Sequence, residues 1–464
     1  MTRSSRIAII VALAIFIEYI DSTVLMISLP ALARDFNVTS IELKLAINAY
    51  FIGMGIFLPL SGWVADRFGA VNIFRWAIAT FVVGSLFCAM SQSLSGFVAA
   101  RFLQGLSAAM MVPIGRVIVY QSAPKSDYIK ALNLLTMSAL LGPIIGPAVG
   151  GYITTYYHWR WIFIINLPIS ILLLFATMLF TKFRLASPHS IDWKGFMYSS
   201  AGLITVAAGL SLIDGKILPP VVAPSLLVIG IFCFGLYWQH FLYRKKNNLT
   251  ALLDLSFLTI STFRFSSLGG ALFRVGAAGS GFLLPLMLQE ERGFSAVETG
   301  YIACASAIGA MAMKMLSFRI LVTLGYRRAL ILNTLFTFAV MCSFALPISH
   351  TSVIIISIIV LLNGFFTSLQ FTSLNSIAYA DLENNDVGGA TSLTSIIQLL
   401  ASITGIAVAA VILQTLQETT AVSSNLFSVA ICVMAFITLT SLCFIRNLNK
   451  YSGNVLLNKK QNEN

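Results

Sequence analysis

Two acids and three arginines interrupt long apolar stretches of the chain, where charged side chains are costly. Glu18 and Asp21 lie three residues apart in the first stretch, so on a helix they share a face. Arg101, Arg116 and Arg274 lie in later stretches. A charge at the centre of a bilayer costs at least about 2.5 kcal/mol, so such side chains normally face a partner or an internal cavity. Two carboxylates that share a face of low dielectric repel each other and favour holding a proton, which is what a proton carrier needs.

The position of each charge along its stretch gives its depth, because a helix rises about 1.5 Å per residue. Glu18 lies near the middle of its span, and Asp21 lies one turn closer to the outside. Arg101 falls in the outer half of its span, Arg116 near an inner end and Arg274 near mid-depth. We expect Asp21 or Glu18 to bind the proton and Arg101 to pair with them. A buried ion pair that only holds helices together is the alternative.

The composition shows what must position these charges. Of the 464 residues, 58% are hydrophobic and 10% are charged, whereas about a quarter of the residues of a soluble domain are charged. This excludes a soluble, fibrous, disordered or disulfide-stapled protein and predicts an all-α membrane protein. Fourteen apolar runs are candidate spans. They are 7–29, 45–65, 74–92, 96–120, 131–156, 160–181, 195–213, 221–242, 264–288, 297–317, 328–347, 352–376, 389–414 and 426–446.

Basic residues predict the orientation of these spans. With the N-terminus inside and fourteen spans, the inner loops and tails hold 19 Lys and Arg, and the outer loops hold five. Basic residues gather on the cytoplasmic side of membrane proteins, so we expect both termini to be cytoplasmic. The net charge of +12 then reflects inner loops and not a nucleic-acid partner. One inner loop breaks the pattern, because Asp381, Glu383 and Asp386 lie there without a base.

Several motifs resemble those of the major facilitator superfamily. Gly62-Trp-Val-Ala-Asp66-Arg67-Phe-Gly69 is similar to its signature loop, and Arg101-Phe-Leu-Gln104-Gly105 resembles its intramembrane arginine motif. Gly142-Pro-Ile-Ile-Gly146-Pro147-Ala-Val-Gly150-Gly151 is similar to its antiporter motif. Residues 21–30 and 159–168 resemble the fourteen-span drug:proton antiporter family within it. The resemblance covers nearly the whole chain.

The resemblance implies a major facilitator fold of two six-helix bundles plus an inserted helix pair, 14 transmembrane helices in all, in a bacterial inner membrane. We expect an N-terminal bundle over 1–182, a linker with two extra helices over 183–255, a C-terminal bundle over 256–446 and a cytoplasmic tail over 447–464. In the family the antiporter motif seals the cavity; helix packing alone is the other interpretation. A stretch at 318–328 repeats the spacing of the signature loop but lacks its aspartate.

The signature loop is expected to act as a cytoplasmic gate, with Asp66 bracing it. Span 13 follows Gly388-Gly389, and a helix N-terminus carries a partial positive charge that Asp66 could meet. The acidic 381–386 loop would then face Arg67 and Arg75. An ionic latch between the two halves is one interpretation of this loop, and a merely solvated acidic loop is the other.

The predicted function is proton-coupled export of small amphipathic molecules by alternating access, of the multidrug efflux type. The partners expected are a small-molecule substrate, protons and membrane lipid, with the chain acting as a monomer. We expect no enzymatic activity, because neither a phosphate-cradling GxxxxGK[ST] nor an HExxH or GxSxG is present. No cofactor or metal is expected, since all six cysteines fall inside apolar runs. Asp21→Asn should abolish proton-driven transport and leave folding intact.

The substrate cavity is predicted to contain polar side chains from several spans: Arg274, Arg116, Gln104, Asn363 and Gln370. Two acids against three arginines leave two substrate classes open, a cationic drug and an anionic metabolite such as citrate or a siderophore. Arg274 has two possible partners. It pairs either with the acids of the first span or with an anionic group of the substrate. A non-transporting membrane receptor is a more remote alternative, because it would not need charges at mid-depth.

Overall fold

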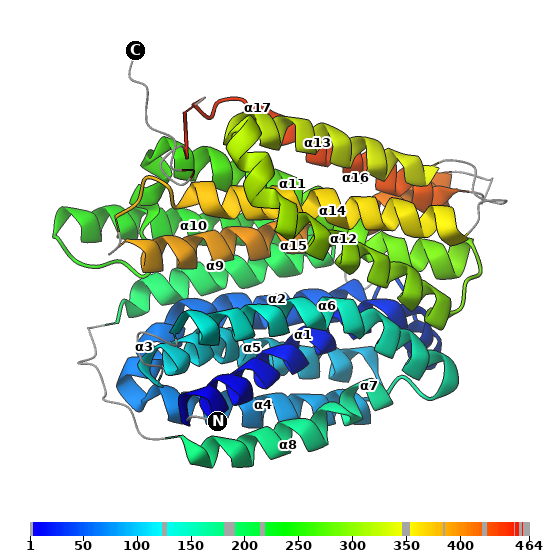
Figure 1. Cartoon of the computed structure of the whole chain (residues 1–464), viewed down its shortest axis with the longest axis horizontal. Helices are drawn as coiled ribbons and strands as arrows, with labels where there is room; N and C mark the ends of the chain where they lie inside the picture. Colours follow the sequence, from blue (N-terminus) through cyan, green and yellow to red (C-terminus); the bar gives the residue numbers. More distant parts are fainter. Residues whose placement is uncertain are drawn as a thin grey trace. The chain divides into compact units, whose positions relative to one another are not determined.

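The computed structural model of the chain describes residues 3–122, 128–180, 191–213, 219–345, 353–383, 386–419, 425–449, 451–453 and 457. Helices are the only long regular elements within those residues, so the prediction of an all-α protein is confirmed (Figure 1). Parts of the linker predicted over 183–255 and most of the tail predicted over 447–464 lie outside the described residues.

Each of the fourteen predicted spans is mostly helical over its described residues. Twelve helical segments of the described residues are long and apolar enough to cross a membrane. The two other predicted spans, at 160–181 and 195–213, form shorter helices, which are described below. Continuous helix is expected of spans, because a helix satisfies its own backbone hydrogen bonds inside a bilayer.

The chain folds into two compact units. The first comprises Met1–Ile204 and Phe294–Cys304, and the second comprises Thr205–Gly293 and Ala305–Asn464. The helices of the first are α1 (Arg3–Phe36), α2 (Lys44–Phe57), α3 (Ser61–Phe68), α4 (Ala70–Met90), α5 (Leu94–Ser122), α6 (Tyr128–Tyr156), α7 (Trp161–Ile164) and α8 (Asn166–Ala176). Those of the second are α10 (Val222–Lys246), α11 (Ser261–Leu286), α13 (Tyr326–Cys342), α14 (Val353–Ala378), α15 (Val387–Thr419), α16 (Leu426–Thr440) and α17 (Leu442–Ile445). Two helices have parts in both units, α9 (Trp193–Ser211) and α12 (Ala296–Leu324).

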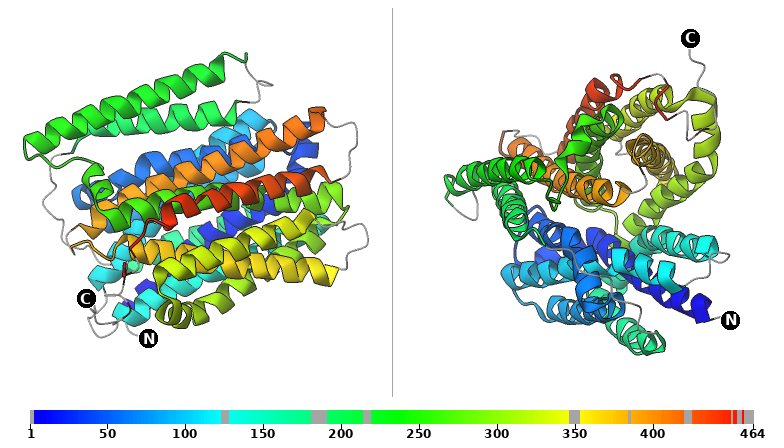
Figure 2. Two further views of the ribbon diagram at one scale, coloured as in Figure 1. Left: turned by 90° about the horizontal axis from the view of Figure 1, so that it is seen from above. Right: turned by 90° about the vertical axis from the view of Figure 1, so that its left-hand side faces the viewer.

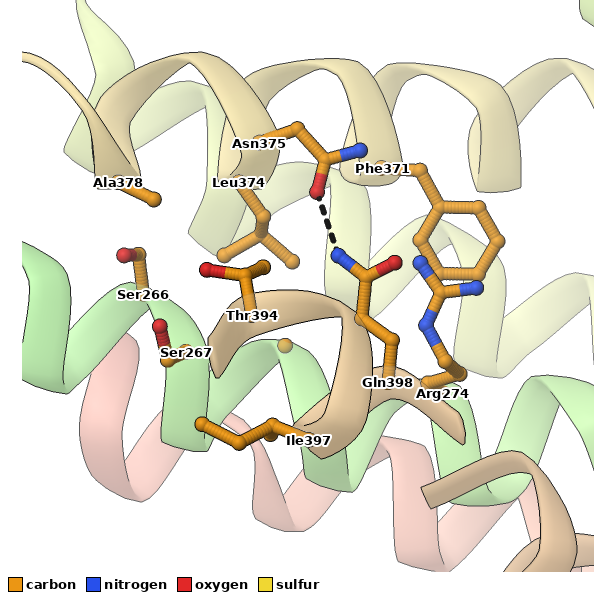
Figure 3. Close-up of a pocket in the computed structure, with 11 residues that line it drawn as sticks. Ser266, Ser267, Arg274, Phe371, Leu374, Asn375, Ala378, Thr394, Ile397 and Gln398 are labelled. Atoms are coloured by element: carbon orange, nitrogen blue, oxygen red, sulfur yellow. Dashed lines mark hydrogen bonds between the residues drawn. The ribbon is translucent and has the colours of Figure 1, made fainter. Parts of the chain in front are cut away.

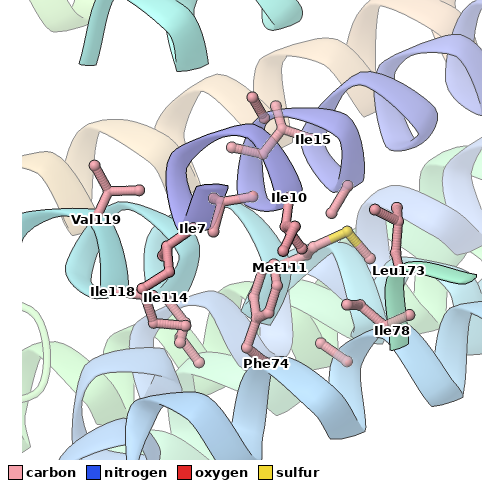
Figure 4. Packing of buried hydrophobic residues seen from close by; sticks show 14 of the residues in the cluster. Ile7, Ile10, Ile15, Phe74, Ile78, Met111, Ile114, Ile118, Val119 and Leu173 are labelled. Carbon is pink, nitrogen blue, oxygen red and sulfur yellow. The ribbon is translucent and has the colours of Figure 1, made fainter. Parts of the chain in front are cut away.

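The core of the first unit forms where α1, α4 and α5 meet. Ile7, Phe74 and Ile114 are at most 2% exposed and belong to one apolar cluster (Figure 4). α1 also runs along α6, and α2 along α5. α1 is longer than the predicted span 7–29. It continues through Pro30 and ends at Phe36, because Asn37 adopts a positive φ of 53°, a conformation that commonly terminates helices.

The second unit has a comparable set of helix pairs. α11 packs on α15 and α16, and α13 packs on α14. Tyr326, Ile377 and Ile445 are buried together at one end of this unit. The extra helices α9 and α10, drawn in green in Figure 2, meet at Gly209 and Gly230, where an added methyl group would overlap the facing helix.

Two features of backbone geometry recur in both units. Gly69, between α3 and α4, has a φ of 90°, and Gly325, between α12 and α13, has a φ of 74°. The carbonyl of each glycine accepts a hydrogen bond from the backbone N–H of the residue four positions later. Its own N–H donates to the carbonyl of the residue four positions earlier. Only glycine adopts such a φ without strain at these junctions. The helix pair α2 and α5 crosses at Gly53 and Gly105, and α12 and α14 cross in the same way, at Gly309 and Gly364.

Candidate functional site

An ion pair between Asp21 and Arg101 forms the centre of a polar cluster inside the first unit. Arg101 Nη1 lies 2.6 Å from Asp21 Oδ2, and the two side chains are 2% and 1% exposed. Asp21 Oδ1 accepts a second hydrogen bond, 2.8 Å long, from Asn166 Nδ2. α1, α5 and α8 each supply one of these residues. Each buried charge is therefore compensated by the other, as a buried ion requires.

Gln104 connects this ion pair to α4. Its Oε1 accepts hydrogen bonds from Arg101 Nη1 at 2.7 Å and from Cys88 Sγ at 3.3 Å. Its Nε2 donates to Ser85 Oγ at 2.9 Å, and the side chain is completely buried. From the sequence, Gln104 was expected in a substrate cavity. The structure places it among the partners of Arg101, which lies three residues before it on the same face of α5.

Glu18 lies beside this cluster but makes no ion pair with a described residue. The Tyr50 hydroxyl donates to Glu18 Oε1 across 3.4 Å, and Oε2 is buried without a hydrogen-bond partner among the described residues. The Tyr50 ring also contacts Arg101, whose guanidinium lies 4.7 Å from the ring centroid. Glu18 is 6% exposed. A buried ionised carboxylate without a cation is costly, whereas Asp21 has a cation in Arg101.

A set of contacts at the other end of α1 positions α8, which carries Asn166. Trp159 Nε1 and Arg160 Nη1 both donate to Asp35 Oδ2 across 2.8 Å. Arg160 Nη2 donates to the Ser91 carbonyl at 3.0 Å, and its guanidinium stacks on the Trp159 ring. These contacts attach the start of α7 to the ends of α1 and α4. The motif at 159–168 thereby places Asn166 against the ion pair.

The glycines of the antiporter motif pack α6 directly on the turn of α1 that carries Glu18 and Asp21. A methyl group added at Gly142, Gly146 or Gly150 would overlap residues 19–24 of α1. Small residues four apart let two helices approach this closely. The motif is therefore a packing surface for the helix that carries the acids.

The motif also has a second contact surface. A methyl group at Gly151 would overlap Ala296, and one at Gly300 would overlap the Pro147 carbonyl, with Ala296 and Gly300 both in the first turns of α12. Both residues of α12 belong to the first unit. α6 therefore has glycine-lined contacts on two sides, with α1 and with the start of α12.

The signature loop at 62–69 lies on α3 and the turn that follows it. Gly62, Asp66 and Arg67 are exposed, and Gly69 forms the turn with the positive φ described above. No atom of the described residues lies within 4 Å of a methyl group added at Gly62. The side chains of Asp66 and Arg67 are therefore accessible.

Other residues of the expected latch have local partners within their own units. Arg75 donates from Nε to Thr177 Oγ1 at 3.1 Å and from Nη2 to the Thr177 carbonyl at 2.8 Å. Asp381 Oδ2 accepts from Thr262 Oγ1 at 2.8 Å. Residues 384–385 of the acidic loop lie outside the described residues.

Each polar residue expected in a substrate cavity is described here within its own unit. Arg274 lies in the second unit and stacks on Phe371, 4.1 Å from the ring centroid. Gln370 is fully buried, and its amide bonds to the side chains of Asn333 and Thr334 between α13 and α14. Asn363 lies on α14, with its Oδ1 buried and without a partner among the described residues. Arg116 is an exposed residue of α5.

No group of three or more His, Cys, Asp or Glu side chains that could hold a metal ion occurs among the described residues. The six cysteines are free thiols.

Comparison with known proteins decides the family. The sequence profile of the Major Facilitator Superfamily matches residues 11–244 and 266–462. The chain belongs to the major facilitator superfamily. The major facilitator fold predicted from the motifs is confirmed, and the chain is a multi-pass membrane transporter of small molecules, not an enzyme.

Relatives within the superfamily match almost the whole chain. The Probable transport protein HsrA of Haemophilus influenzae is 32% identical over 97% of this chain and 97% of its own length. The Putative multidrug resistance protein MdtD of Pectobacterium carotovorum is 33% identical over 87% of this chain and 86% of its own. The protein of the same name from Escherichia coli O157:H7 is 31% identical, over 97% and 96%.

Solved structures of other superfamily members share the fold. The POT family transporter PepTSo superposes with a TM-score of 0.72 at 14% identity, covering 96% of this chain and 98% of its own. A D-xylose–proton symporter superposes with a TM-score of 0.69 at 13% identity, covering 97% and 99%. At these identities the likeness concerns the fold alone.

Several residues of the site were not predicted from the sequence. Ser85 and Tyr50, which contact Gln104 and Glu18, are two of several polar residues on α4 and α2, so nothing in the sequence distinguished them. Asn166 belongs to the motif at 159–168, and its amide in an otherwise apolar run was the available signal. Buried amides need partners, so such a position predicts a polar neighbour on another helix.

Proposed function

We propose that this transporter is a proton-coupled exporter that moves small amphipathic molecules out across the bacterial inner membrane by alternating access. The observation that supports the proposal most directly is the buried arrangement of Asp21, Arg101 and Glu18. Asp21 pairs with Arg101, whereas Glu18 forms no ion pair with any described residue. The names of the MdtD relatives, which refer to multidrug resistance, are the reason to propose drug-like substrates.

In this proposal Glu18 exchanges the transported proton. It lacks a cation among the described residues, so a proton neutralises it at little structural cost, whereas Asp21 is already stabilised by Arg101 and Asn166. A proton that reaches Asp21 weakens its ion pair with Arg101 and loosens α1 from α5. Each charge that moves with the membrane potential supplies about 2.3 kcal/mol per 100 mV, which corresponds to a concentration ratio of about fiftyfold.

The proposed topology is the one derived from the basic residues, with both termini in the cytoplasm and the chain working as a monomer in lipid. We also propose the division into an N-terminal bundle over 1–182, a helix-pair linker over 183–255 and a C-terminal bundle over 256–446. Asp66 and Arg67 then lie on the cytoplasmic side and act in the gate. After the six native cysteines are replaced by serine, labelling of single cysteines placed at Gly62 and Ser295 with a membrane-impermeant maleimide tests this topology, since the two should react from opposite sides.

The coupling proposal is tested with Glu18→Gln. The amide keeps the shape and can still accept from Tyr50, but it cannot exchange a proton. In everted membrane vesicles, dye uptake driven by an imposed pH gradient should be lost. Exchange of labelled for unlabelled substrate, which requires no net proton movement, should survive in reconstituted liposomes.

Glu42→Gln is the matched control, because Glu42 lies in the loop after α1 and its side chain accepts a hydrogen bond from the neighbouring Thr39 hydroxyl, away from the buried cluster. It should transport as the unmodified chain does. Full gradient-driven uptake by Glu18→Gln would contradict the role of Glu18. Loss of exchange together with loss of gradient-driven uptake would assign Glu18 to substrate translocation in general and not to proton coupling.

A further inference from the structure

A small pocket lies between α11, α14 and α15, entirely within the second unit. Arg274, Phe371, Asn375, Thr394, Gln398 and Ser267 are among its lining residues (Figure 3). The cavity has a volume of about 20 Å³, which admits roughly one water-sized group. It can therefore hold one end of a ligand, while a drug-sized molecule would extend beyond it.

Three hydrogen-bonding groups on the wall of this pocket are buried without partners among the described residues. They are Ser267 Oγ, Thr394 Oγ1 and Arg274 Nε. Ser267 and Thr394 are 6% and 5% exposed, so protein atoms enclose both hydroxyls. Buried polar groups are normally hydrogen-bonded, so three such groups around one cavity indicate a missing acceptor.

The pocket carries a positive charge from Arg274, and neighbouring side chains hold the guanidinium in place. No acidic side chain lines it, and Arg274 makes no ion pair with a described residue. The guanidinium lies 4.1 Å from the Phe371 ring centroid, which holds it in one plane. Gln398 Nε2 donates to Asn375 Oδ1 at 2.9 Å, which fixes the amide that lies beside Arg274 in Figure 3.

We propose that this pocket binds the anionic group of the transported molecule, and that the substrates are amphipathic carboxylates. A carboxylate offers acceptors only, which suits a guanidinium and two hydroxyl donors. Phe371 provides an apolar surface beside the carboxylate for the rest of the molecule. The inference rests on the proposed function in so far as it calls the ligand a substrate, but the binding itself can be measured without a proton gradient.

The experiment uses three fluorescent probes that share a dansyl group and differ in charge. Dansylglycine carries a carboxylate, dansylglycinamide is its neutral amide, and dansylcadaverine is a cation. Binding to the purified full-length protein in lipid nanodiscs is measured at equilibrium from the rise in dansyl fluorescence. We expect dansylglycine to bind at least about tenfold more tightly than its amide, the effect of about one charge-assisted hydrogen bond.

Arg274→Lys keeps the charge but loses the planar pair of donors, so it should remove most of that preference and leave dansylcadaverine binding unchanged. Arg264→Lys is the matched control, because Arg264 lies on the same helix and also stacks on a phenylalanine, Phe265. It is exposed and lies outside the lining of the pocket, and its substitution should change nothing. Thr394→Val removes one hydroxyl at constant shape and should weaken dansylglycine binding by about fivefold.

Two results would overturn the anion site: equal affinity for dansylglycine and its amide, or a carboxylate preference that survives both Arg274→Lys and Thr394→Val. The first result would mean that the pocket does not select an anion, and the second that the carboxylate binds elsewhere in the protein. Failure of the proposed function has a different signature. Carboxylate preference at equilibrium would then persist while a pH gradient drives no uptake, and Glu18→Gln would have no effect on uptake.

Discussion

Removing one member of the Asp21–Arg101 pair should destabilise the protein. Removing both should lower the free energy of unfolding by much less than the sum of the two single losses. The structure revises the expectation from the sequence that Asp21→Asn leaves folding intact. Asp21 and Arg101 are 1% and 2% exposed and 2.6 Å apart, so the asparagine would leave a guanidinium buried without a counter-charge. Breaking a buried pair in this way costs about 3–5 kcal/mol. The asparagine NH2 would also face the donors of Asn166 or Gln104.

The magnitude is measured in a double-mutant cycle. Asp21→Asn, Arg101→Gln and the double variant are unfolded with SDS in mixed micelles, and the free energy of unfolding is followed by intrinsic fluorescence. Each single substitution should lower it by about 3–5 kcal/mol. The double variant has no buried charge, so its loss should be at least about 2 kcal/mol smaller than the sum of the two.

The Asp35–Arg160 pair is a matched control within the same unit. Its atoms lie at a similar distance, 2.8 Å, but the side chains are 37% and 31% exposed. The coupling between Asp35→Asn and Arg160→Gln should stay below about 1 kcal/mol, as for other pairs in contact with solvent. If the Asp21–Arg101 coupling is no larger than the Asp35–Arg160 coupling, burial does not determine the strength of the pair and the prediction is refuted.

Two further predictions concern the packing surface of α6 and the gate. Gly146→Leu should abolish transport, because even the leucine Cβ would overlap Thr23 and move the turn that carries the acids. Gly235→Ala is the control and should be neutral, because no atom of the described residues lies within 4 Å of the added methyl group. Retained transport by Gly146→Leu in vesicles would refute the close packing of α6 on α1. Asp66→Asn should slow turnover by several-fold with unchanged equilibrium binding of dansylglycine and unchanged thermal unfolding, since Asp66 is exposed. An unchanged turnover rate would argue against a gate at this position.

The sequence was sufficient to predict the helices and the charges that lie within them. Apolar runs of about 20 residues predict spans by length alone, and charges inside such runs are so costly that each one indicates a partner or a cavity. The depth of Asp21 and Arg101 therefore led directly to two residues that meet in the structure. The break in the sixth run was not predicted. There α7 ends at Ile164 and α8 begins at Asn166.

What the sequence could not provide is the rotation of each helix about its axis. These helices are apolar on nearly every side, so they lack the polar stripe from which the inward face of a soluble helix is deduced. Gln104 and Gln370 were both expected in a substrate cavity, yet the first bonds to Arg101 and the second to Asn333. For the same reason nothing in the sequence indicated that Ser267 and Arg274, two helical turns apart, line one pocket.

The two units combine a repeated backbone with different chemistry. Gly53 and Gly309 are 256 residues apart, as are Gly69 and Gly325, and each pair has the same structural role. At the same spacing, the residue that corresponds to Glu18 is Arg274. The repeat therefore places Glu18 in the first unit and Arg274 at the corresponding position of the second. Neither forms an ion pair with a described residue. If the first serves the proton and the second the substrate anion, the two functions are separable: Glu18→Gln should change coupling and leave the carboxylate preference intact, and Arg274→Lys should do the reverse.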